Sequence, residues 1–187
     1  MKNIENFIKK TFFMILAVVI TGVNVLQPTT VNAYTTGATF STYYTTDNVN
    51  VRKGPGTSYA SYGIIPANTV LWTGQYQGTS GSWIKIRIFN SKTETTGYIN
   101  SSYLKTTTTN RFYTATDNVN IRKGPGTSYG IITTIPKGAD QRLWYAHKVH
   151  ANGYTWVATD GANSNISLGS SGYYIGAYAW VALDYFK

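Results

Sequence analysis

The sequence predicts an all-β protein built from two small barrels in tandem, after a signal peptide. Short segments alternate apolar and polar residues, as in "NVNVR" (residues 48–52) and "WIKIRIF" (residues 83–89), and this period of two is typical of half-buried strands. The stretch from Asp47 to Tyr59 returns from Asp117 to Tyr129 with a single change, Val51 to Ile121. Self-similarity at a fixed offset indicates two copies of one domain.

The first 33 residues are typical of a secretion signal. Three lysines precede the apolar run from Phe12 to Ile20, and Val31 and Ala33 supply small side chains for cleavage after Ala33. An uncleaved anchor would need about 20 consecutive apolar residues to span a membrane, and polar residues interrupt this run too soon. We therefore expect a secreted chain that begins at Tyr34 and has no stable membrane anchor.

Charge and cysteine content limit the function classes. Removal of residues 1–33 takes three lysines and one glutamate from the formal net charge of +9, which leaves +7 on the mature chain. A protein with this charge is attracted to anionic surfaces. The chain has no cysteine, which excludes a disulfide framework, a thiol nucleophile and a lipid-modified cysteine.

The repeat sets the expected domain boundaries. The first copy covers residues 43–105, a polar linker covers 106–111, and the second copy covers 112–187. Trp83 and Tyr98 are 15 positions apart, whereas the matching pair Trp156 and Trp180 are 24 apart. The second copy therefore carries an insertion near residues 160–178, and its many glycine, serine and asparagine residues predict a long loop.

The repeated "RKGPGTS" stretch is explained as a turn. Pro55 presets the φ angle for the second position of a type I or II turn, and Gly56 can adopt the positive φ that a type II turn requires next. The strand must end near Arg52, and a loop then projects. Turn geometry thus accounts for these residues and for their counterparts in the second copy without a binding role.

The pattern "NVR.GPGTSY", followed by an "IP.G" step, a tryptophan strand and a final "GYI...YL" strand, resembles the bacterial SH3 domain. The resemblance covers nearly all of residues 43–187 and is weaker after Trp144. It implies an SH3-like barrel of five to seven strands, used in secreted bacterial and phage proteins as a noncatalytic module that binds peptidoglycan. Fold alone does not fix function, although an aromatic barrel face can stack on peptides or sugars.

Candidate ligand-binding residues flank the repeated turn or lie in the strands that follow it. The arginines that end the first strand of each copy either meet a ligand carboxylate or brace the loop. The tyrosines have apolar rings with polar tips, although tyrosine is frequent throughout the chain. The candidates are Arg52, Tyr59, Tyr62, Tyr98 and Tyr103 in the first copy, and Arg122, Tyr129, Tyr145, Tyr178 and Tyr185 in the second.

No catalytic residue, metal site or cofactor is expected. His147 and His150 are three positions apart, so on one strand they point to opposite faces, and the nearest acids form no ligand pattern. The few carboxylates are scattered over separate elements, which does not favour a glycosidase pair. The expected function is therefore noncatalytic.

The sequence favours a secreted, wall-associated protein that binds a peptidoglycan peptide or another anionic wall polymer through two modules. No nucleic-acid partner is expected. The alternatives are a secreted interaction or antibacterial factor, or a targeting subunit for a separate wall hydrolase. In that case the divergent second copy would contact a protein partner while the first binds the wall.

Overall fold

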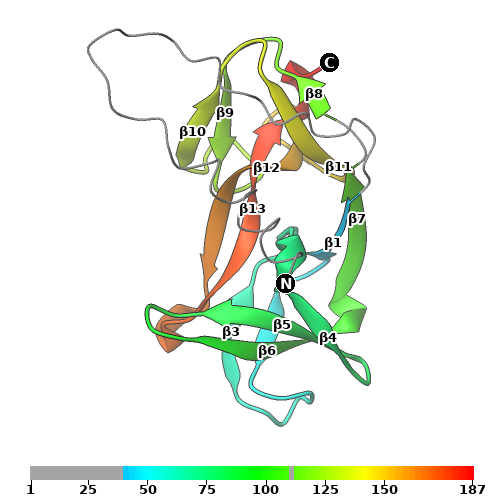
Figure 1. Ribbon diagram of the computed structural model, residues 1–187, viewed down its shortest axis with the longest axis vertical. Helices are drawn as coiled ribbons and strands as arrows, with labels where there is room; N and C mark the ends of the chain where they lie inside the picture. The colour runs from blue at the N-terminus through cyan, green and yellow to red at the C-terminus, as the bar shows by residue number, and fades with distance from the viewer. Residues whose placement is uncertain (1–39, 110–111) are drawn as a thin grey trace, which may run out of the picture. The chain divides into compact units, whose positions relative to one another are not determined.

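The computed structural model describes residues 40–109 and 112–187, and in these ranges the protein is all-β, as predicted (Figure 1). The signal-peptide prediction falls outside the described residues. No helix in the described ranges is long and apolar enough to cross a membrane. The strands are β1 (Phe40–Thr45), β2 (Val49–Arg52), β3 (Ser61–Ile65), β4 (Tyr76–Ser80), β5 (Trp83–Phe89), β6 (Glu94–Asn100), β7 (Leu104–Thr109), β8 (Phe112–Thr114), β9 (Val119–Arg122), β10 (Ile131–Ile135), β11 (Asp140–Ala151), β12 (Tyr154–Ser167) and β13 (Tyr174–Ala182). Four short 3-10 turns, η1 (Thr73–Gln75), η2 (Ser101–Tyr103), η3 (Gly169–Ser171) and η4 (Leu183–Tyr185), complete the order.

The first copy forms antiparallel ladders whose register follows the apolar pattern. β2 pairs with β3 across the loop at residues 53–60, and β5 pairs with both β4 and β6. Along β5, Ile84, Ile86 and Ile88 are buried while the residues between them are partly exposed. Because side chains alternate between the two faces of a strand, this pattern fixes which face of β5 covers the core.

The second copy repeats the local hydrogen bonds of the first at an offset of 70 residues. Thr45 N donates to Thr69 O at 3.0 Å, and its counterpart Ala115 N donates to Ala139 O at 2.9 Å. The bridge between Tyr44 and Val70 likewise matches the pairing of Thr114 with Asp140. The shared sequence therefore builds the same strand and loop twice.

The insertion of the second copy is a β-hairpin, whereas a long loop was predicted near residues 160–178. β12 and β13 pair over most of their length, with a register shift between Thr159 and Asn163, and η3 forms the connection (Figure 1). Apolar side chains explain the difference, because Leu168 and Ile175 are buried, with 1% and 0% exposed. Burial of these side chains outweighs the loop-forming tendency of the neighbouring small polar residues.

The hairpin enters the core of the first copy. Leu168 and Ile175 belong to the same buried cluster as Val51, Ile65 and Ile86. Gly63 on β3 permits the close approach, since a Cβ atom at this position would lie 2.1 Å from the backbone oxygen of Leu168. The first core is therefore completed by side chains from the second copy.

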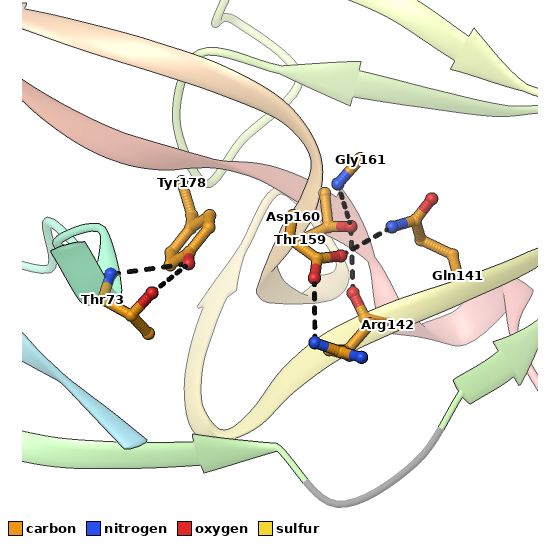
Figure 2. Close-up of polar contacts among 7 residues, drawn as sticks. All are labelled: Thr73, Gln141, Arg142, Thr159, Asp160, Gly161 and Tyr178. Atoms are coloured by element: carbon orange, nitrogen blue, oxygen red, sulfur yellow. Dashed lines mark hydrogen bonds and ion pairs between the residues drawn. The ribbon is translucent and has the colours of Figure 1, made fainter. Parts of the chain in front are cut away.

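Polar contacts join β13 to the segment after β3. The backbone nitrogen of Tyr178 donates to Val70 O at 2.9 Å, and Trp72 Nε1 donates to Ala177 O at 3.0 Å. The Tyr178 hydroxyl accepts a bond from Thr73 N at 3.5 Å and lies 3.4 Å from Thr73 Oγ1 (Figure 2). The described residues, 40–109 and 112–187, belong to one compact unit, so the division into two separate barrels stays a prediction.

A second polar cluster surrounds Asp160, where the β12 ladder is irregular. Gln141 Nε2 donates to Asp160 Oδ1 at 3.1 Å, and Arg142 Nη1 lies 3.6 Å from Oδ2 (Figure 2). The Arg142 guanidinium also lies 4.3 Å from the centre of the Phe40 ring and 5.1 Å from that of Phe112. Burial raises the pKa of Asp160, and the nearby positive charge of Arg142 opposes that rise.

His147 on β11 packs between aromatic rings of both copies. Its ring is stacked on Tyr44 of β1, with centroids 3.7 Å apart, and meets the Trp180 ring edge-on at 5.9 Å. The imidazole Nε2 is buried and has no hydrogen-bond partner among the described residues. Burial lowers the pKa of His147 below its ordinary value, because the charged form is poorly solvated there.

We expect this histidine to make the fold less stable in mild acid. The unfolded chain takes up the proton near pH 6.5, whereas the folded chain, with its lowered pKa, resists it. Stability is therefore full above pH 6.5 and is lost as the pH falls through the folded pKa. Denaturant unfolding at pH 7 and pH 5 should show a lower free energy of unfolding in acid.

The variant His147→Phe isolates this contribution, since it keeps the ring stack and removes the titrating group. The pH dependence should be smaller in the variant than in the unmodified chain. Asp160 acts with the opposite sign, because its raised pKa makes protonation favour the folded state, and it is present in both proteins. An equal pH dependence in the two proteins would contradict the assignment to His147.

Candidate ligand-binding grooves

Each copy carries an open groove at the equivalent place, between the short strand β2 or β9, the repeated loop that follows it and the 3-10 turn η2 or η4. The groove of the first copy has a volume of about 210 Å³ and is lined by Asn48, Val49, Asn50, Arg52, Thr57, Trp83, Asn100, Ser102 and Tyr103. That of the second copy has a volume of about 280 Å³ and is lined by Asp117, Asn118, Val119, Asn120, Arg122, Thr127, Tyr154, Trp156, Ala182 and Tyr185. We name them groove 1 and groove 2. Five lining positions at the offset of 70 carry the same residue in both grooves, and the matching tryptophan and tyrosine also recur, whereas Asn100 of groove 1 corresponds to Ala182 of groove 2.

The strand-end arginines brace the repeated loops. Arg52 Nη1 donates to the backbone oxygen of Tyr59 at 2.8 Å, and Arg122 Nη1 makes the same bond to Tyr129 O at 2.8 Å. Arg122 also donates to Thr127 O at 3.1 Å. Of the two roles considered for these arginines, the bracing role is therefore observed, and both guanidinium groups also line a groove.

In each copy, the tyrosine at the end of the repeated loop packs its ring against the first glycine of that loop. A Cβ atom added at Gly54 would lie 2.4 Å from Tyr59 Cδ1, and one at Gly124 would lie 2.3 Å from Tyr129 Cε1. This contact requires glycine at these positions regardless of the turn type. The loop that borders each groove is thus held by an arginine on one side and an aromatic ring on the other.

Asparagine side chains provide the polar part of each groove. Asn48 Oδ1 accepts a bond from Ala67 N, and Asn118 Oδ1 accepts one from Lys137 N, both at 2.9 Å. The next asparagine differs between the copies. Asn120 Oδ1 accepts a bond from Thr134 Oγ1 at 2.9 Å, whereas Asn50 makes no side-chain hydrogen bond among the described residues. Groove 1 therefore keeps a full amide available for a ligand.

Aromatic rings provide the apolar part of each groove. Trp83 is partly exposed in groove 1, whereas Trp156 is 2% exposed and its Nε1 donates to Ala151 O at 2.9 Å. In groove 2 the Tyr185 and Tyr154 rings lie 5.9 Å apart, and Tyr185 Oη donates to Tyr154 Oη at 3.4 Å. That hydrogen bond contributes most to raising the pKa of Tyr185. The Tyr185 phenol thus remains neutral near pH 7.

The predicted site residues fall into two groups. Arg52, Tyr103, Arg122 and Tyr185 line the grooves. The others lie outside the groove linings. Tyr59 and Tyr129 cover the loop glycines, Tyr62 contacts Tyr173 at 4.9 Å, Tyr98 lies on β6 opposite Lys85, Tyr145 lies 6.1 Å from Tyr113, and Tyr178 is buried against Trp144 at 5.0 Å. Binding itself stays a prediction for all ten.

The candidate residues chosen from the sequence did not include the groove asparagines or Trp83. Asn48 and Asn50 occupy the polar face of β2, and their exact repetition in the second copy was the available signal. Trp83 starts β5 and is partly exposed beside groove 1, whereas Trp156 lies within β12, lines groove 2 and is buried in a core cluster. Among the described residues, no group of three or more histidine, aspartate or glutamate side chains is arranged to hold a metal ion.

The first copy is a small all-β module in which a long loop connects the paired strands β2 and β3. The family comparison is more specific, because residues 47–105 match the model of the bacterial SH3 domain. This segment is therefore similar to the bacterial SH3 domain over about a third of the chain. The match ends at residue 105, so the relation of the second copy to the family rests on its likeness to the first.

Solved structures show only remote similarity. NlpC2 from Trichomonas vaginalis is 13% identical with a TM-score of 0.28, covering 79% of this chain and 48% of that chain. NlpC1 from Trichomonas vaginalis is 10% identical with a TM-score of 0.28, and the match covers 83% of this chain and 48% of NlpC1. Ly7917 is 22% identical with a TM-score of 0.22, and the match covers 76% of this chain and 60% of Ly7917. The chain spans about half the length of the first two proteins, and TM-scores this low do not establish a shared overall fold. No curated protein is significantly similar to the chain.

Proposed function

We propose that this protein is a secreted, noncatalytic cell-wall-binding protein that holds peptidoglycan peptides in its two grooves. The observation that carries the proposal is the repetition of one groove, with asparagine, arginine, threonine and aromatic residues at matching positions. The bacterial SH3 domain at residues 47–105 supports a role at the cell wall.

The chemistry of the grooves suits a peptide. Asparagine amides both donate and accept hydrogen bonds, so they match the alternating N–H and C=O groups of an extended backbone. The flat rings of Trp83 and Tyr103 offer apolar area to such a chain at low conformational cost. One arginine borders each groove, which also suits the carboxylates found in wall peptides.

The net charge of the mature chain adds a second, less specific attraction. A charge of +7 draws the protein to polyanions such as teichoic acids. This attraction is screened by salt, with a Debye length of about 8 Å at physiological ionic strength. Recognition in a groove depends on short-range contacts and should persist when salt is raised.

Sedimentation with purified sacculi tests the proposal. The mature chain should sediment with sacculi that have been stripped of teichoic acids, and most of this binding should remain at high salt. Sacculi that still carry teichoic acids should bind additional protein, and this additional fraction should disappear in high salt. Absence of binding to stripped sacculi at low salt would overturn the proposal.

The noncatalytic character is part of the proposal and has its own measurement. The chain offers no cysteine for a thiolate mechanism. Purified protein should leave the turbidity of a wall suspension unchanged over hours, in parallel with a buffer control. A progressive loss of turbidity would assign the protein to the wall hydrolases.

A further inference from the structure

A third cavity lies outside both grooves, on the first copy only. It has a volume of about 230 Å³ and lies between β1, the η1 turn and β5, with Tyr43, Leu71, Trp72, Gln75, Tyr76 and Ile86 among its lining residues. In the second copy the equivalent positions near residues 141–146 continue as strand β11. The repeated module therefore does not account for this cavity.

The inner wall of the cavity depends on the inserted hairpin. A Cβ atom at Gly176 of β13 would lie 2.5 Å from the Trp72 ring and 2.9 Å from Gln75 Nε2. Trp72 is also held by its hydrogen bond to Ala177 O. The hairpin of the second copy thus sets the position of two side chains that face a cavity of the first.

Gln75 supplies an unused acceptor in this cavity. The residue is 2% exposed, and its Oε1 has no hydrogen-bond partner among the described residues. A buried carbonyl without a partner is costly, by about 1–3 kcal/mol. A ligand with an N–H or O–H group would satisfy it.

The other lining residues indicate a neutral ligand with an apolar face. None of the cavity's lining residues is charged, although the chain as a whole is basic. The Tyr43 and Tyr76 rings lie 5.8 Å apart at 44°, and Tyr76 is 47% exposed at the mouth. Leu71 and Ile86 are almost fully buried and close the apolar floor. The volume is below the range of about 300–1,000 Å³ typical of sites for drug-sized ligands, which favours a single ring.

We propose that this cavity binds one N-acetylated sugar residue of a neutral glycan. The acetamido N–H donates to Gln75 Oε1, the acetyl methyl group packs on Leu71 and Ile86, and the sugar ring lies on Tyr76. The proposal extends the proposed function, since it assigns the glycan strands of the wall to a site separate from the two peptide grooves.

Titration with a soluble trimer of N-acetylglucosamine tests this site, with tryptophan fluorescence and residue-specific amide chemical shifts as readouts. The mature chain should bind the trimer, and shifts should concentrate at residues 71–76. The variant Gln75→Leu should bind at least about fivefold more weakly, as expected for one lost hydrogen bond. Tyr76→Ala changes an exposed ring, so the fold is retained, and it should weaken binding by a similar factor. The matched control Tyr103→Ala, in groove 1, should bind the trimer as the unmodified chain does.

Several results would overturn the sugar assignment. These are no binding of the trimer up to millimolar concentration, equal binding of a glucose trimer without acetamido groups, or shifts centred on a groove. Preferential occupation of the cavity by a proline-rich peptide would overturn it as well. A sugar-free wall peptide serves as the separate probe of the grooves, so failure of the sugar site and failure of the peptide proposal are distinguishable.

Discussion

Replacing Leu168 or Ile175 with alanine is expected to destabilise the first copy, although both residues belong to the second. Each side chain is almost fully buried in the cluster that also holds Val51 and Ile65. Removal of a buried Leu or Ile side chain to alanine costs about 2–5 kcal/mol. Denaturant unfolding should show this loss, and native-state hydrogen exchange should show faster opening of β2 and β3.

Two glycine variants sharpen this result without creating a cavity. Gly63→Ala places a methyl group against the Leu168 carbonyl and should separate the hairpin from β3, whereas Gly74→Ala has open space around the new atom. Gly63→Ala should strongly lower the free energy of unfolding, whereas Gly74→Ala should leave it nearly unchanged. If Leu168→Ala and Ile175→Ala left the hydrogen-exchange rates of β2 and β3 unchanged, the conclusion that both copies share this core would be contradicted.

Loss of one groove is expected to weaken binding to intact wall far more than it weakens binding to a soluble peptide. Two linked sites gain about 10²–10⁴ in apparent affinity when both engage one polymer. Tyr103→Ala in groove 1 or Tyr185→Ala in groove 2 removes a side chain that is 41% or 36% exposed, so folding should be preserved. Each single variant should lose most of the avidity for sacculi in a sedimentation assay at high salt.

The double variant and one control complete this experiment. Tyr103→Ala combined with Tyr185→Ala should reduce the salt-resistant binding to the part that the sugar cavity supports. Tyr76→Ala lies outside both grooves and should leave binding of a sugar-free wall peptide unchanged. Equal sacculus binding by the unmodified chain and the double variant would show that neither groove contacts the wall.

Local patterns in the sequence were sufficient to predict the strands and the repeated loop. Alternation along β5 is a short-range feature, and it is found where the pattern puts it. The repeated loop follows β2 as predicted, but its turn differs from the type II geometry, because Gly56 does not have a positive φ. The turn bonds run from Gly56 N to Gly54 O and from Tyr59 N to Gly56 O. The all-β class follows from the strand pattern. The arginines at the groove edge could also be predicted, because Arg52 ends a strand just before the turn.

The hairpin could not be predicted in the same way. Its apolar residues, Leu168 and Ile175, are separated by glycine and serine residues, which favour loops in isolation. Their partners are Val51 and Ile65, more than 100 positions earlier in the chain. Such long-range contacts leave no local signal, and the cavity beside Gln75 was missed for the same reason.

The most direct test of the proposed function is the stoichiometry of a sugar-free wall peptide, titrated into the mature chain by calorimetry at physiological salt. Two peptide-binding grooves predict two peptides bound per chain, and one for each of the variants Tyr103→Ala and Tyr185→Ala. No peptide bound, or a stoichiometry that neither variant changes, would contradict the account.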